Sequence, residues 1–176
     1  GDAEARAGGR VYLGYLLGTS MALLLPAIIA TWAFAGTLEF TPGGILAGKI
    51  SGGAAAGLVA LYAFGIGKAA LMPLHRWLPA AMVAPTPVSA LLHAVAVVKA
   101  GVFTIVKVVV YVFGLDFEPA AFAWLPWVAG FTILAASVVA LRADNLKRRL
   151  AYSTVSQLSY VVLAAALLAP LSVAGA

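Results

Sequence analysis

Long apolar stretches alternate with short polar ones along the 176-residue chain. A membrane-spanning helix needs about 20 mostly apolar residues, because each residue advances the helix by about 1.5 Å across a hydrocarbon core of about 30 Å. Five stretches reach this length, over residues 11–34, 51–72, 88–113, 122–141 and 150–168. The pattern therefore predicts an all-α, polytopic membrane protein with about five transmembrane helices, which make up a single transmembrane region over residues 1–176.

The segment between the second and third stretches is apolar, yet one straight helix cannot run through it. It holds four prolines between Pro73 and Pro87. Each proline lacks a backbone N–H and disfavours helical geometry in the residue before it. We therefore expect a broken helix near Pro73–Pro87, with a half-helix over residues 75–82 packed inside the protein.

Composition agrees with a lipid environment. The chain is 64% hydrophobic and 10% charged, whereas soluble domains have about 25% charged residues. It has no cysteine and two histidines, so thiolate metal sites, iron–sulfur clusters and disulfides are excluded and a metal enzyme is disfavoured. We expect no cofactor, no metal and no nucleic-acid partner, and we expect ion transport rather than catalysis by the chain alone.

The positive charges indicate an orientation. If five helices alternate, one side receives only Lys49, while the other receives seven basic residues: Arg6, Arg10, Arg76, Arg142, Lys147, Arg148 and Arg149. Cytoplasmic loops of membrane proteins carry an excess of lysine and arginine. The N-terminus and the loop over residues 142–149 are thus expected in the cytoplasm, with the chain in the cell (inner) membrane.

Four basic side chains fall inside the predicted spans: Lys68, His93, Lys99 and Lys107. A charged group at membrane depth is costly, so it is by default a hypothesis of function. Lys68 is open to two interpretations, an interfacial lysine or a functional one, and His93 is either a satisfied core residue or a proton relay. Lys99 lies too deep to reach the interface easily, whereas Lys107 is near enough for a structural role.

Two further patterns concern the contacts between helices. Ser153, Ser156, Gln157 and Tyr160 recur at helical spacing, which fits either interhelical hydrogen bonds or the lining of a hydrated cavity. The pairs Gly14/Gly18 and Gly53/Gly57 have the spacing of small residues where helices pack closely. All six carboxylates lie outside the spans, so a counter-ion for a buried lysine is expected from outside this chain.

Three motifs give the chain a family resemblance. They are GKAALMPLHRWLP over residues 67–79, APTPVSALLHA over residues 84–94 and DNLKRRLAYSTVSQL over residues 144–158. Together they resemble the antiporter-like membrane subunits of respiratory complex I, Mrp-type cation/proton antiporters and energy-converting hydrogenases. The lysine six residues after His93 is most similar to the Mrp-type subunits. The resemblance implies that the chain is the middle of a longer subunit, from its sixth to its tenth helix.

The resemblance also implies roles for residues. Lys68 matches the central lysine of a discontinuous helix, and His93 and Lys99 match a lateral hydrated proton path. The secondary candidates are His75, Lys107, Lys147, Ser156 and Gln157. The implied counter-ion of Lys68 is a glutamate on an earlier helix of the family.

Three functions are therefore weighed. The first is a proton-translocating subunit of a monovalent cation/proton antiporter, and the alternative is a proton-pumping membrane-arm subunit of an NADH:quinone oxidoreductase or a membrane hydrogenase. A structural membrane subunit without transport is the second alternative. The expected partners are other membrane subunits of an antiporter or redox complex, protons, Na⁺ or K⁺, and the lipid bilayer.

Overall fold

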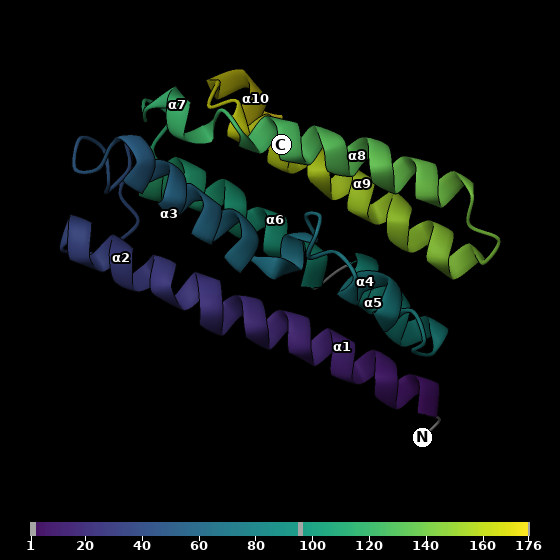
Figure 1. The fold of residues 1–176 in the computed structure, drawn as a ribbon. Coiled ribbons are helices and arrows are strands. Elements are labelled where there is room, and N and C mark those ends of the chain that lie inside the picture. Colours follow the sequence, from purple (N-terminus) through teal and green to yellow (C-terminus); the bar gives the residue numbers. More distant parts are fainter. Residues whose placement is uncertain (1–2, 95–96, 176) are drawn as a thin grey trace.

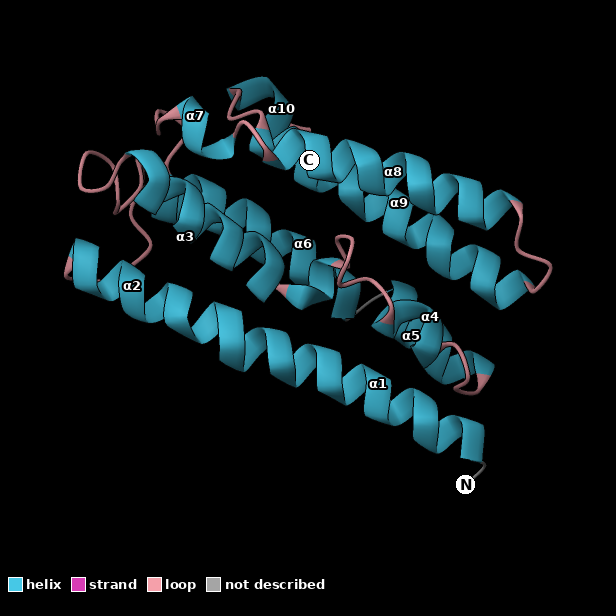
Figure 2. Cartoon of the chain, in the orientation of Figure 1, coloured by secondary structure: helices cyan, strands magenta, loops and turns pink. Residues whose placement is uncertain are grey.

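A computed structural model describes residues 3–94 and 97–175 of the chain. Every regular element in these residues is a helix, with no strand among them (Figure 2). This confirms the all-α prediction. Two of the described helices, Ala3–Ala35 and Pro119–Leu141, are long and apolar enough to cross a membrane by themselves. The predicted number of five spans is not confirmed by this criterion.

The first predicted span is part of a longer helix of 33 residues. Three segments follow one another without interruption: α1 (Ala3–Thr19), the π-helical turn η1 (Ser20–Leu24) and α2 (Leu25–Ala35). Pro26 lies in the first turn of α2, directly after the π-helical turn, which is a common way for a helix to accommodate a local irregularity. Gly36 ends the helix with a φ of 74°, and its N–H bonds the Trp32 carbonyl at 2.8 Å.

The second predicted span, over residues 51–72, is wrong at its C-terminal end. The helix α3 stops at Gly65, and only a 3-10 turn follows before the half-helix α4: α3 (Gly52–Gly65), η2 (Gly67–Ala69) and α4 (Trp77–Ala81). The break therefore begins before Lys68 rather than at Pro73. The predicted half-helix over residues 75–82 exists in a shorter form as α4.

The remaining helices follow the predicted order with shifted ends. The stretch over residues 88–113 holds three helices, α5 (Thr86–Ala94), α6 (Val97–Lys107) and the π-helix η3 (Val108–Phe113). The last two stretches correspond to α7 (Pro119–Phe122), α8 (Leu125–Leu141), α9 (Leu146–Ala166) and α10 (Pro170–Ala174). Asn145 caps α9, because its side chain accepts the N–H groups of Lys147 and Arg148, as N-cap residues commonly do.

The helices lie in three layers (Figure 1). The continuous helix α1–α2 forms one outer layer and the antiparallel pair α8 and α9 forms the other, while α3, α4, α5 and α6 lie between them. Contacts join α1 to α4, α2 to α3, and α6 and α4 to α9, so the middle layer packs on both neighbours.

The two ends of this bundle differ in charge. The N-terminus, α4 and the connection between α8 and α9 lie at one end (Figure 1). The seven basic residues that the sequence assigned to one side lie at this end: two in α1, one directly before α4, one directly after α8 and three in the first turn of α9. Lys49 belongs to the segment between α2 and α3, at the opposite end.

Candidate functional site

Lys68 lies in the break between α3 and α4. The 3-10 turn η2 carries it, directly after the end of α3. Ala70 follows with a φ of 55°, a left-handed conformation that costs a non-glycine residue about 1–3 kcal/mol and persists only where its surroundings hold it. The backbone around Lys68 is therefore fixed by contacts from other segments rather than by helical hydrogen bonds.

Two hydrogen bonds between side chains and backbone hold this break. The buried Trp77 donates its indole N–H to the carbonyl of Gly67 at 2.9 Å. The backbone N–H of Met72 donates to the Thr132 hydroxyl of α8 at 3.3 Å, and Thr132 is fully buried. Backbone polar groups that leave a helix in the interior need such partners. One bond thus lies on each side of Lys68.

Close packing of α6 against η2 adds a further constraint. A Cβ atom placed on Gly101 would lie 2.5 Å from the backbone nitrogen of Ala69 and 2.5 Å from the backbone carbonyl carbon of Lys68. Only glycine allows such an approach between two backbones. Because Lys99 precedes Gly101 by two residues on α6, the helix that carries Lys99 crosses the chain at Lys68.

A second glycine contact lies on the other side of the break. A Cβ atom on Gly67 would overlap the side chain of Thr19, at the end of α1, and one on Gly65 would lie 2.6 Å from the backbone nitrogen of Leu24. The end of α3 is therefore held against the long first helix. Thr19 itself is buried and bonds the Tyr15 carbonyl at 2.8 Å.

The three main candidates differ in how the structure places them. The side chains of Lys68 and Lys99 are both exposed on the described part of the chain. His93 belongs to α5, directly before α6 in the sequence, but its side chain lies outside what the structure describes. The fold thus brings the Lys68 turn and the Lys99 helix together, and the side-chain position of His93 stays untested.

The secondary candidates have local partners. Lys107 Nζ lies 4.8 Å from the ring centre of Phe40 and 5.7 Å from that of Phe103, which is a cation–π arrangement. The His75 ring lies 5.8 Å from that of Tyr152. These contacts do not include Lys68 or Lys99.

The other three secondary candidates lie on α9. Ser156 is buried and its hydroxyl lies 2.9 Å from that of Ser137 on α8, so it joins the two helices in the manner expected of interhelical hydrogen bonds. Gln157, the next residue, is exposed. The polar positions of α9 therefore divide between the helix interface and the outer face. Lys147 Nζ donates to the Ala84 carbonyl at 3.1 Å and ties the start of α9 to the segment after α4.

The residues that shape the break are not among the candidates predicted from the sequence. They are Trp77, Thr132, Thr19 and Gly101, and an aromatic, two hydroxyls and a glycine are ordinary in membrane helices. The glycine pairs that were expected to pack closely have open space instead: no described atom would lie within 4 Å of a Cβ on Gly14, Gly18, Gly53 or Gly57.

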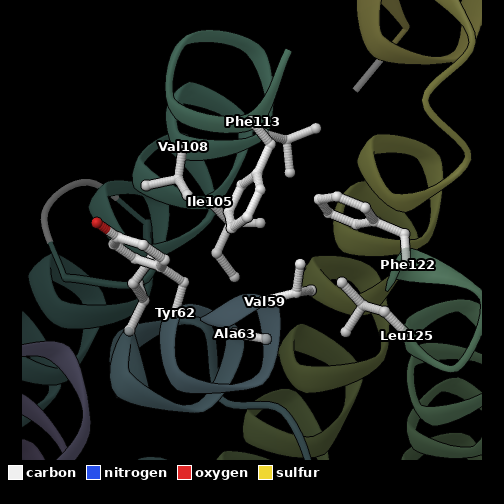
Figure 3. A pocket seen from close by; sticks show the side chains of 10 residues that line it. Val59, Tyr62, Ala63, Ile105, Val108, Phe113, Phe122 and Leu125 are labelled. Carbon is white, nitrogen blue, oxygen red and sulfur yellow. The ribbon is translucent and has the colours of Figure 1, made fainter. Parts of the chain in front are cut away.

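The interior between α3, α6 and α8 is apolar (Figure 3). A cavity of about 10 Å³ is lined there by hydrophobic side chains and by Tyr62. The Tyr62 oxygen points away from Phe113 and Leu125 in Figure 3, and it lies 2.7 Å from the Thr31 hydroxyl. A buried water needs two or more polar partners, and Tyr62 is the one polar side chain in the lining of this cavity.

Residues with metal-binding side chains are dispersed. Among the described residues, no group of three or more histidine, aspartate and glutamate side chains gathers at one place.

Comparisons with known proteins show to which family the chain belongs. Residues 2–176 match the protein family described as "NADH:quinone oxidoreductase/Mrp antiporter, TM". The chain belongs to this family. Its members are transmembrane proteins by that description, so the membrane environment inferred from composition is confirmed.

Relatives come from both branches of the family. NAD(P)H-quinone oxidoreductase chain 5 of Synechocystis sp. is 38% identical over 151 residues, which are 81% of this chain and 21% of the relative. The chloroplastic NAD(P)H-quinone oxidoreductase subunit 5 of Cryptomeria japonica is 44% identical over 99 residues, or 56% of this chain and 13% of that protein. The structure of the Mrp complex from Dietzia sp. aligns with a TM-score of 0.82 and 31% identity, over 97% of this chain and 19% of that one. The chain thus spans about a fifth or less of the length of these proteins.

Proposed function

We propose that the chain is the central part of a proton-translocating, antiporter-like subunit, in which protons pass laterally along Lys68, His93 and Lys99. The observation that carries this proposal is the contact between the Lys68 turn and α6, the helix of Lys99. The turn of one lysine and the helix of the other meet where α3 is interrupted. Ionisable groups at such positions in membrane proteins commonly mark ion pathways.

The break holds the backbone at Lys68 while its side chain stays free to move. Lys68 follows the C-terminus of α3 after Ile66 and Gly67. The bonds to Gly67 and Met72 hold the backbone, while the exposed side chain is free to turn. A proton arriving at Lys68 could thus be exchanged without a rearrangement of the helices around it.

The chain would cross the membrane five times in this proposal. The passages are α1–α2, α3 with its break, α5–α6–η3, α7–α8 and α9. The basic end of the bundle would face the cytoplasm, because cytoplasmic segments carry the excess of lysine and arginine. This places the N-terminus and the loop over residues 142–149 inside the cell, in a single transmembrane region over residues 1–176, and the whole subunit in the cell (inner) membrane.

Among the two transport systems, the relatives favour a redox-driven one. The curated relatives of Synechocystis and Cryptomeria are named as NAD(P)H-quinone oxidoreductase subunits, so we infer a proton-pumping arm of a quinone oxidoreductase complex, with other membrane subunits as partners. Cation/proton antiport, with Na⁺ or K⁺, is the second candidate, because the Mrp complex structure aligns over 97% of the chain.

Alanine substitutions in the full reading frame test the proposal. We expect Lys68→Ala and Lys99→Ala to abolish proton uptake by everted membrane vesicles. Lys49→Ala is the matched control, since Lys49 is an exposed lysine at the opposite end and its amine donates to the Ala35 carbonyl at 2.8 Å. Transport that persists in both Lys68→Ala and Lys99→Ala would leave a structural role for this chain.

The driving force separates the two transport systems. If the chain works in a redox complex, the interior of everted vesicles acidifies when NAD(P)H and a quinone are added. If it works in an antiporter, the internal pH changes when a Na⁺ or K⁺ gradient is applied.

A further inference from the structure

We propose that a basic cavity at the end of the bundle binds the phosphate headgroup of an anionic phospholipid. The cavity has a volume of about 770 Å³ and opens between the start of α1, the half-helix α4 and the start of α9. Its charged and polar lining comes from these three elements: Glu4, Arg76, Asn145, Lys147, Arg148 and Tyr152. Neither Lys68 nor Lys99 lines it, so the proposal stands apart from proton transfer.

The charges in the cavity suit a phosphate. The lining includes three cationic side chains and one carboxylate, that of Glu4. Arg76 and Arg148 are exposed, and the guanidinium of Arg148 lies 5.8 Å from the ring centre of Tyr152, which orients its planar set of donors. Arginine binds phosphate through two parallel hydrogen bonds. Lys147 contributes charge, although one of its N–H groups is used by the Ala84 carbonyl.

An apolar groove beside the cavity distinguishes a lipid from free phosphate. The groove has a volume of about 380 Å³ and runs between α1 and the segment of α4. It shares Ala80 and Val83 with the basic cavity. Gly9 and Tyr12 lie on its other wall. A phosphate site that continues into an apolar groove matches the headgroup and acyl chain of one phospholipid, and basic pockets between membrane helices bind such headgroups.

The test uses the full reading frame, purified with its native partners and titrated with phosphatidylglycerol or phosphatidylcholine while bound lipid is counted by native mass spectrometry. We expect Arg76→Ala/Arg148→Ala to weaken phosphatidylglycerol binding about thirtyfold, as two basic side chains at a membrane surface predict. Arg6→Ala/Arg142→Ala is the control, because both arginines are exposed at the same end and neither lines the cavity or the groove. Arg76→Lys/Arg148→Lys keeps the charge but loses the paired hydrogen bonds of the guanidinium groups, so its affinity for phosphatidylglycerol should lie between those of the unaltered protein and of Arg76→Ala/Arg148→Ala.

A second variant tests the groove. Gly9→Leu should fit α1 without overlap, since no described atom would lie within 4 Å of a Cβ at this position, and its side chain should fill the groove. We expect it to weaken phosphatidylglycerol binding while leaving the binding of inorganic phosphate unchanged.

Three results would overturn the proposal. The first is equal affinity of the Arg76→Ala/Arg148→Ala protein and the unaltered protein for phosphatidylglycerol. The second is binding of inorganic phosphate as tight as that of the lipid, which would give the groove no role. The third is a map of the intact complex in which a protein segment fills the cavity.

Discussion

Gly101→Ala adds a single methyl group at the crossing of α6 and the Lys68 turn. The added Cβ would lie 2.5 Å from two backbone atoms and 2.8 Å from the Cβ of Lys68. Backbone atoms cannot rotate away as a flexible side chain can. The two segments must therefore separate by roughly 1 Å to restore ordinary contact distances.

The size of the effect follows from two opposing contributions. Overpacking of this kind costs about 1–3 kcal/mol, while replacing glycine by alanine inside a helix gains about 1 kcal/mol. Gly130→Ala is the matched control on α8, because no described atom would lie within 4 Å of its Cβ. The free energy of unfolding should thus differ between the two variants by about 1–3 kcal/mol, with Gly130→Ala the more stable.

The effect on transport should be larger than the effect on stability. A displacement of about 1 Å in a group positioned for chemistry can lower a rate about a hundredfold, and the displaced group here is the turn of Lys68. The assays are proton uptake by everted vesicles, followed with a pH-sensitive dye, and thermal unfolding of the purified protein in detergent. We expect Gly101→Ala to lose most of its uptake and Gly130→Ala to keep it.

The reasoning is refuted if Gly101→Ala transports protons as fast as Gly130→Ala and unfolds at the same temperature. If Gly101→Ala is less stable but transports protons at the full rate, the Lys68 turn tolerates displacement. The contact at Gly101 would then no longer support the proposed path.

Two other predictions concern the hydrogen bonds around the break and the core. Trp77→Phe removes the N–H that bonds the Gly67 carbonyl at 2.9 Å, and should lower the free energy of unfolding by about 1–3 kcal/mol in denaturant or thermal melts. Thr31→Val and Tyr62→Phe break the buried hydroxyl pair at 2.7 Å, and a double-mutant cycle should give a coupling of about 0.5–1.5 kcal/mol.

Each of these has a control. Trp127→Phe, at a tryptophan that is 82% exposed, should leave unfolding unchanged, so equal losses from Trp77→Phe and Trp127→Phe would contradict the role of the indole bond. Additive effects of Thr31→Val and Tyr62→Phe would show that the hydroxyl pair contributes no stability of its own.

The start of the break between α3 and α4 could be predicted from the sequence only in part. Prolines located an interruption near residue 73, because a proline removes a hydrogen bond wherever it occurs. The interruption begins at Gly65, in a stretch with no proline. There the helix ends because Gly65 and Gly67 pack against α1 and η1, and Trp77 bonds the Gly67 carbonyl. These partners are distant in the sequence, so no local pattern could reveal them.

The sequence also failed to predict which glycines pack closely against another helix. Regular spacing marked Gly14/Gly18 and Gly53/Gly57 as packing sites, yet the described chain leaves open space at all four. Gly101 has no regular partner, and it makes the contact on which the candidate site depends. Spacing along one helix shows which residues share a face, but another helix decides whether that face is covered.

The sequence by itself determined the membrane class, the all-helical fold, the order of the apolar segments, the family and the identity of the candidate lysines. These follow from composition, from hydrophobic length and from motifs, which are properties of the chain in any conformation. Only the tertiary structure decided where α3 ends, which helix crosses Lys68, and that α1, α4 and α9 enclose a basic cavity. Each of these depends on contacts between segments far apart in the chain, and such contacts exist only after the helices have packed.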